Sequence, residues 1–176
     1  MQDELIIKEV KSGNKEKFSL LVEKYQDTLF TFIYYSLRDE ASAKDILQET
    51  FIKALKEIDK YKEEGKFKAW LWTIARNKVM DFYRKAGKIV PLEEEALNLN
   101  QGDETSKKAF SKLELSHIES IIENLPTEQK EVVLLRQYLS FKEIAAVLDC
   151  PLGTVLARLN RAIKKIQKSL GEEYAA

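Results

Sequence analysis

Apolar residues recur three and four positions apart along almost the whole chain, which is the spacing of one face of an α-helix. No segment alternates apolar and polar residues as a half-buried strand does. Glycine and proline, which punctuate turns, are scarce, with 6 and 3 among 176 residues. The pattern therefore predicts an all-α fold.

One region interrupts the helical pattern. The turn residues of 86–91 are followed by a polar and acidic stretch, 93–108, whose composition suits a linker. We therefore expect two small helical domains, at 1–88 and 113–176, joined by a flexible acidic linker at 89–112. Domains of this size bury only about 60% of their unfolded surface, so each is expected to be modestly stable alone.

The second domain carries the signals of a helix-turn-helix. Thr127 is placed to N-cap a first helix. Ser140 and Glu143 have the spacing of a capping box at the start of a short second helix. This helix is expected to end at 149–151, and a longer third helix to begin near Gly153. A short helix, a tight turn and a longer helix are the plan of a DNA-binding helix-turn-helix.

The third helix is predicted to have an apolar face and a cationic face. No acidic residue occurs between 152 and 170, and the cationic face consists of Arg158, Arg161, Lys164, Lys165 and Lys168. Arginine and asparagine on a helix can read base edges in a major groove, while lysine neutralises phosphate. The pattern favours DNA binding, although a three-helix bundle with a solvated basic face has the same spacing.

In the first domain, the segment 43–58 predicts an amphipathic helix. Its apolar stripe consists of Leu47, Phe51, Ala54, Leu55 and Ile58. The opposite side carries Asp45, Gln48, Glu49 and Ile52. An apolar side chain flanked by carboxylates and an amide is typical of a protein contact. A solvated face with one exposed isoleucine fits the same spacing, so both interpretations stay open.

The segment 70–85 holds both tryptophans of the chain among basic residues. The expected core arc consists of Leu71, Ile74, Ala75 and Phe82, with Trp70 at its edge. A second stripe contains Trp72, Arg76, Val79 and Tyr83, and a third side contains Asn77, Asp81 and Arg84. Rings beside cations suit single-stranded nucleic acid, because bases stack on the rings while cations hold phosphate. A helix buried on two sides would show the same stripes, and the helical wheel alone favours that alternative.

The composition excludes several classes of site and protein. Cys150 and His117 are each the single residue of their type, so neither a disulfide framework, a zinc site nor a histidine-based triad is expected. The chain has no apolar run of about 20 residues and no signal-peptide pattern, which predicts a cytoplasmic protein. The charges of the 29 basic and 29 acidic residues cancel, but the two signs are unevenly distributed along the chain. Between 90 and 105, every charged residue is acidic.

Three blocks, in order, resemble the extracytoplasmic-function sigma factors, the two-domain type of bacterial sigma factor. "AKDILQETF" resembles the helix of that family that docks on the clamp of RNA polymerase. "FKAWLWTIARNKVMDFYRK" resembles its promoter-melting and downstream-element block. "LSFKEIAAVLDCPLGTVLARLNRA" resembles its helix-turn-helix, which reads the upstream (−35) element as duplex. Together the blocks extend over nearly the whole chain.

The resemblance implies a role for each block of residues. The first domain would be similar to sigma region 2 and the second to sigma region 4. Contacts to polymerase would come from Asp45, Gln48, Glu49 and Ile52. Contacts to the −10 element as single strand would come from Lys66, Trp72, Arg76, Asn77, Tyr83 and Arg84. Contacts to the −35 duplex would come from Thr154, Leu156, Ala157, Arg158, Asn160, Arg161, Lys164 and Lys165.

The resemblance also implies partners. These are core RNA polymerase through its clamp and flap, promoter DNA, and an anti-sigma factor. The loop 59–66 matches the loop that captures a flipped base, which selects steps that unstack at low cost. The acidic linker would thread the nucleic-acid channel of the polymerase, with Glu93, Glu94 and Glu95 standing in for phosphates. No catalytic residue, cofactor or metal is implied, because polymerisation belongs to the core enzyme.

The sequence departs from the family's pattern at the start of the third helix. Leu156 and Ala157 stand where the family usually has a basic residue and a serine, so we expect Asn160 and Arg161 to provide most base discrimination.

The main alternative function is a stand-alone helix-turn-helix repressor that dimerises through its first domain. A helical adaptor that binds no DNA is a third hypothesis. Neither alternative requires both a polymerase-docking face and a strand-capture face.

Overall fold

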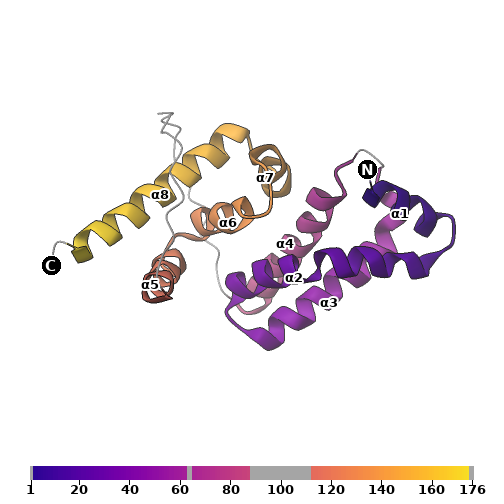
Figure 1. Ribbon diagram of the computed structural model, residues 1–176, viewed down its shortest axis with the longest axis horizontal. Coiled ribbons are helices and arrows are strands. Elements are labelled where there is room, and N and C mark those ends of the chain that lie inside the picture. The colour runs from indigo at the N-terminus through magenta and orange to yellow at the C-terminus, as the bar shows by residue number, and fades with distance from the viewer. Residues whose placement is uncertain (1, 63–64, 88–111, 175–176) are drawn as a thin grey trace. The chain divides into compact units, whose positions relative to one another are not determined.

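The computed structural model describes residues 2–62, 65–87 and 112–174 (Figure 1). Within these ranges the chain is helical and contains no strand, which confirms the predicted all-α class. The helices form two compact units, which are described separately: α1–α4 make the first, and α5, α6 and α8 make the second, with the short α7 between α6 and α8 in the chain. The predicted linker 89–112 falls almost entirely outside the described residues. None of the described helices has the length and apolar character that a membrane span requires.

The first unit consists of four α-helices and two short 3-10 helices. Their bounds are α1 (Gln2–Lys11), η1 (Lys15–Lys17), α2 (Phe18–Leu37), α3 (Glu40–Glu57), η2 (Ile58–Lys60) and α4 (Phe67–Lys85). Helices α2, α3 and α4 pack on one another pairwise, and α1 packs on α2 (Figure 1). The centre of the unit is apolar, and Leu21, Leu29, Ile33, Leu71 and Trp72 are each 0–1% exposed.

The core face of α3 is turned relative to the prediction. Leu47 and Leu55, which were expected in the apolar stripe, are only half-buried. The buried face instead includes Ala43, Ile46 and Thr50. Thr50 fits there because its hydroxyl donates to the carbonyl oxygen of Ile46 at 2.7 Å, which satisfies a polar group that would otherwise be costly to bury.

A two-residue turn joins α2 to α3. Arg38 ends α2 with a φ of 56°, in the left-handed region that often closes a helix, and its N–H donates to the carbonyl of Tyr34. Asp39 is the N-cap of α3, and its carboxylate accepts from the N–H of Ser42 at 2.9 Å. So short a connection makes α2 and α3 antiparallel neighbours.

The second unit is formed by α5 (Lys112–Glu123), α6 (Thr127–Arg136) and α8 (Leu152–Tyr174), and α7 (Phe141–Leu148) lies between α6 and α8 in the chain. The predicted N-cap at Thr127 is wrong. Pro126 is the N-cap residue of α6, with an extended ψ of 143°, and no side chain caps this helix end. The fixed φ of proline lets the chain enter the helix one residue earlier, so Thr127 lies inside the first turn.

The predicted capping box of α7 is confirmed. The backbone N–H of Ser140 donates to the Glu143 carboxylate at 2.7 Å, and the N–H of Glu143 donates to the Ser140 hydroxyl at 3.4 Å. Asp149 ends the helix with a φ of 50°, as the predicted turn at 149–151 requires. The longer helix α8 then begins at Leu152. The helix-turn-helix geometry therefore follows from local hydrogen bonds.

Replacing Asp39 with alanine is expected to lower the Tm of the first unit at neutral pH, because the N-terminus of α3 loses its acceptor. Hydrogen bonds from the side chain and backbone of Ser42 hold the pKa of Asp39 below its ordinary value. The stabilisation is therefore present above the unfolded-state pKa and is lost as pH falls through the lower folded-state pKa. Both tryptophans lie in α4, so tryptophan fluorescence follows this unit.

The Tm difference between wild type and Asp39→Ala should consequently shrink in acid. Asp39→Asn is the matched control, because asparagine caps a helix but does not titrate. That variant should keep most of the Tm at neutral pH. A Tm difference for Asp39→Ala that is the same at neutral and acid pH would contradict the assignment.

Candidate nucleic-acid interface

Four side chains form an exposed strip on α3, called here the α3 strip: Asp45, Gln48, Glu49 and Ile52. Their spacing of three, four and seven residues places them on one side of the helix. Ile52 is 46% exposed, although most large apolar residues of this unit are buried. The exposure expected from the sequence is therefore confirmed for all four.

An ion pair connects the α3 strip to α4. The ammonium of Lys78 donates to the Glu49 carboxylate at 2.7 Å, and the two side chains are 25% and 58% exposed. This hydrogen bond lowers the pKa of Glu49 below its ordinary value, so the carboxylate is charged at neutral pH. The strip is thus anionic at one end and apolar at the other, and the ion pair links it to Lys78 of α4.

The structure corrects the prediction that Trp72 is presented to a ligand. The indole is 0% exposed and lies edge-on to the ring of Tyr25 at 5.7 Å between centroids. Its neighbour on the same predicted stripe, Val79, is 1% exposed. The reason is that α4 packs against both α2 and α3, so two of its faces are core. The alternative of a helix buried on two sides is the correct one for this stripe.

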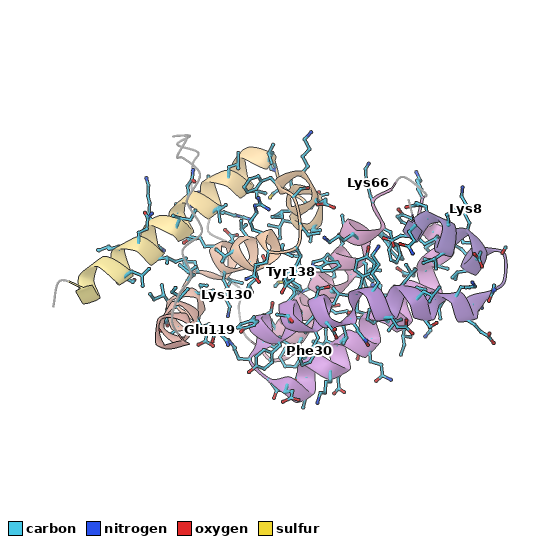
Figure 2. All side chains as sticks on the ribbon, in the orientation of Figure 1. Lys8, Phe30, Lys66, Glu119, Lys130 and Tyr138 are labelled. Atoms are coloured by element: carbon cyan, nitrogen blue, oxygen red, sulfur yellow. The ribbon has the colours of Figure 1, made fainter. Side chains whose placement is uncertain are left out.

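The tryptophan that reaches the surface is Trp70, which was expected in the core. It is half-buried, and its ring lies 5.3 Å from that of Tyr61 and 5.6 Å from that of Phe67. Exposed lysines come just before it in the chain, at Lys60, Lys62 and Lys66. Lys66 lies where the chain enters α4 (Figure 2). The position of Trp70 at the edge of the predicted core arc was the one sequence signal for its exposure.

The other predicted residues of α4 divide into exposed and structural ones. Asn77 and Arg84 are exposed, and Arg84 lies 3.2 Å from the carboxylate of Asp81. Arg76 is half-buried. The hydroxyl of Tyr83 donates to the carbonyl of Ser36 at the end of α2, so this side chain holds α4 to α2. The prediction that Tyr83 is simply presented to a ligand is therefore wrong in part: its ring is half-buried and its hydroxyl is used inside the unit.

Two of the residues of α8 that were predicted to contact the −35 duplex are not available to a ligand. The guanidinium of Arg158 lies 3.0 Å from the carboxylate of Glu128 on α6, and the side chains are only 16% and 13% exposed. Ala157 is 8% exposed. Its methyl group is short, and the longer Asn160 and Arg161 follow three and four residues later on the same face. Both assignments to DNA contact are corrected.

The remaining predicted residues of α8 stay accessible. Lys164 and Lys165 are exposed, and Thr154, Leu156, Asn160 and Arg161 are partly exposed. At 100° per residue these six fall within about half of the helix circumference. The apolar Val155 and Ala162, each 0% exposed, lie on the opposite side. The accessible side of α8 therefore combines two lysines, an arginine and an asparagine.

Family models match both units. A model described as "Sigma-70 region 2" matches residues 21–89, and one described as "Sigma-70, region 4" matches residues 116–166. The "ECF RNA polymerase sigma-E factor" of Haemophilus influenzae is 33% identical, over 97% of this chain and 96% of that protein. The "RNA polymerase sigma-H factor" of Pseudomonas aeruginosa is 32% identical, over 96% and 94%.

Solved structures show the same fold. CnrH, in complex with the cytosolic domain of CnrY, gives a TM-score of 0.74 at 27% identity, and the match covers 98% of this chain and 99% of that one. The sigma factor RpoE of Bartonella quintana, in complex with the anti-sigma factor NepR, gives a TM-score of 0.69 at 26% identity, covering 89% and 98%.

The Glu128–Arg158 pair is expected to stabilise the second unit. Glu128→Gln leaves a mostly buried guanidinium without its anion, which should lower the free energy of unfolding by about 1–3 kcal/mol. Hydrogen exchange of α6 and α8 amides measures this loss. The control is Glu40→Gln, which breaks a pair to Lys44 whose side chains are 66% and 65% exposed, and should change exchange in α3 by less than about 0.5 kcal/mol. Equal effects of the two substitutions would contradict the structural role of Arg158.

Proposed function

Because the chain belongs to the extracytoplasmic-function sigma factors, and is thus an initiation factor that directs core RNA polymerase to promoters, we propose that it divides this task among three surfaces. The α3 strip docks on the polymerase, the start and exposed side of α4 take the −10 strand, and α8 reads the −35 duplex. The observation that supports this division is the order of the matches along this chain, region 2 and then region 4. A relative of nearly equal length matches the chain from end to end.

The alternative of a stand-alone repressor is not favoured. Such a protein needs a helix-turn-helix and a dimerisation surface, and the region 2 match over residues 21–89 would have no function in it. A helical adaptor that binds no DNA would likewise leave the region 4 match and the accessible lysines of α8 without a ligand.

We propose that the α3 strip contacts polymerase through a charged and an apolar part. Asp45 and Glu49 are exposed carboxylates, and Glu49 is charged at neutral pH because of its hydrogen bond with Lys78. Ile52 supplies an apolar side chain that is buried only when a partner covers it. The partner surface is therefore expected to be basic around an apolar patch.

For the −10 element, we propose that the start of α4 binds the strand, since Trp72 is buried. Trp70 is the indole that reaches the surface, and exposed lysines such as Lys66 precede it. A ring for stacking beside cations for phosphate is the combination that single-stranded DNA requires. Asn77 and Arg84 remain as exposed polar groups further along the helix, where an amide can read a base edge and a guanidinium can hold phosphate.

For the −35 element, we propose that Arg161 and Asn160 read bases in the major groove while Lys164 and Lys165 neutralise phosphates. Leu156 is partly exposed and suits an apolar contact with a thymine methyl group. Arg158 is removed from this set, since Glu128 already holds its guanidinium.

Polymerisation is the chemistry of the core enzyme, and no reaction is assigned to this chain. An anti-sigma factor is a further partner, as in the solved complex of RpoE with NepR. Since polymerase and promoter DNA are its ligands, the protein is expected to act in the cytoplasm.

Start-site mapping with core polymerase tests the function. The chain, mixed with bacterial core polymerase and a genomic promoter library, should produce new run-off start sites. Asp45→Ala/Glu49→Ala should lose polymerase binding with an unchanged fold, because the α3 strip loses both its carboxylates. Polymerase affinity is measured by co-migration or fluorescence titration.

The matched control is Glu23→Ala/Asp27→Ala, which removes two exposed carboxylates at the same four-residue spacing from α2. This variant should bind polymerase like wild type. The function is wrong if the chain yields no new start sites and binds duplex DNA tightly alone. The docking assignment alone is wrong if both double variants bind polymerase equally well.

Arg161→Ala is expected to cost about 1–3 kcal/mol of binding at one base pair of the upstream element, since a bidentate contact to a base is lost. Lys164→Ala is the comparison: it should weaken binding uniformly across sequences and reduce the slope of log K against log salt by about one. Both are measured by titrating the holoenzyme against variant −35 duplexes at several salt concentrations. A uniform loss for Arg161→Ala would show a phosphate contact instead.

A further inference from the structure

Tyr61, which lies between η2 and α4, is held by contacts from α1 and from the start of α4. We propose that helix α1 positions the start of α4 through Tyr61, and so sets the geometry in which the −10 strand is captured. Glu4, Lys11 and Tyr61 are then positioning residues for promoter opening. The inference rests on the proposed function of the start of α4.

The hydroxyl of Tyr61 makes two hydrogen bonds. It donates to the Glu4 carboxylate of α1 at 2.6 Å, and it accepts from the backbone N–H of Lys66 at 3.0 Å. The backbone carbonyl of Tyr61 accepts from the ammonium of Lys11, also on α1, at 2.6 Å. Tyr61 is 5% exposed. The four residues Glu4, Lys11, Tyr61 and Lys66 are called here the Tyr61 cluster.

The bond to Lys66 replaces a missing helix cap. Lys66 is the N-cap residue of α4, and its side chain caps nothing. In a capping box the backbone N–H of the N-cap residue is satisfied by a glutamate or glutamine three positions on, but Ala69 stands there. The Tyr61 hydroxyl takes over that function, so the first turn of α4 is connected directly to α1.

The ring of Tyr61 fixes the aromatic surface beside it. It lies edge-on to Phe67, with centroids 5.5 Å apart and an angle of 81° between the rings, and it is tilted against Trp70 at 5.3 Å. Trp70 is the half-exposed indole proposed to take a base. A shift of Tyr61 would therefore change the position of Trp70 and of the exposed Lys66 together.

Helix α1 is attached to the rest of the unit independently of Tyr61. Asp3 of α1 accepts from the hydroxyl of Tyr25 and from the ammonium of Lys24, both on α2. Ile7 and Val10, which are 0% and 2% exposed, add apolar contacts to the core. The hydrogen bonds between Tyr61 and both Glu4 and Lys11 are thus additional to the contacts that hold α1 on α2. They act on Tyr61 and, through it, on the start of α4.

The test compares two hydroxyl deletions in the full chain bound to core polymerase. Tyr61→Phe removes the hydroxyl but keeps the ring, while Tyr25→Phe removes the other tyrosine hydroxyl that reaches a carboxylate of α1. The probe is a promoter fragment found by start-site mapping, used as intact duplex and with its −10 element pre-opened by mismatches. Permanganate reactivity of thymines measures the rate of opening.

Tyr61→Phe should slow opening of the duplex by about tenfold, the effect of losing a hydrogen bond to a charged group. It should leave polymerase affinity unchanged, and its transcription from the pre-opened fragment should stay within about twofold of wild type. Lys11→Met is a second variant that keeps the ring and the hydroxyl, and should slow opening to a smaller extent. Tyr25→Phe and the charge-matched Lys15→Met should open the duplex like wild type.

Wild-type opening rates in both Tyr61→Phe and Lys11→Met would overturn the inference. So would an equal loss in Tyr25→Phe, because the effect would then come from general loosening of α1. Equal losses on duplex and pre-opened fragments, with weaker polymerase binding, would also overturn it. Failure of the wild-type chain to open any promoter would overturn the proposed function, and this inference with it.

Discussion

Burial of α4 on two sides is the constraint on which the surfaces of the first unit depend. Trp72 is fully buried, so the helix uses that side to hold α2, and the Glu49–Lys78 pair ties it to α3. A helix that packs two faces into a core has only a narrow strip and its ends left for a ligand. Trp70 in the first turn and the exposed Asn77 and Arg84 further along the helix remain accessible. The arrangement of the core thus decides what this unit presents to DNA.

In both units a polar contact joins residues far apart in the chain, and one partner lies in, or at the start of, a helix proposed to bind DNA. In the first unit the Tyr61 hydroxyl joins Glu4 to the start of α4, and in the second Glu128 joins α6 to Arg158 of α8. Neither contact belongs to the regular hydrogen-bond pattern of a helix. Tyr61 is buried, and the side chains of Glu128 and Arg158 are mostly buried. Directional bonds of this kind restrict rotation and sliding of a helix more than apolar packing does, since hydrogen bonds weaken steeply as angles change.

Much of the fold was predictable from local sequence signals. Helical periodicity, the Ser140–Glu143 capping box and the turn at 149–151 depend on residues a few positions apart, and each is present in the structure. Exposure of the α3 strip was predictable for the same reason. The roles of Trp70 and Trp72 were not, because a helical wheel gives directions without showing how many helices surround it. Tyr61 and Glu128 were missed because their partners lie 57 and 30 residues away along the chain, at Glu4 and Arg158.

The Glu128–Arg158 pair has a consequence for how promoter preference can evolve. Replacing either residue alone leaves a mostly buried charge without its partner, which destabilises the protein. A lineage that changes one residue must therefore pass through a less stable protein or change both residues at once. Position 158 is therefore a poor site for drift in sequence recognition, although it lies within the cationic helix. Variation in promoter preference among descendants of this protein is expected to accumulate at positions 156, 160 and 161, which are partly exposed and are proposed to face the bases.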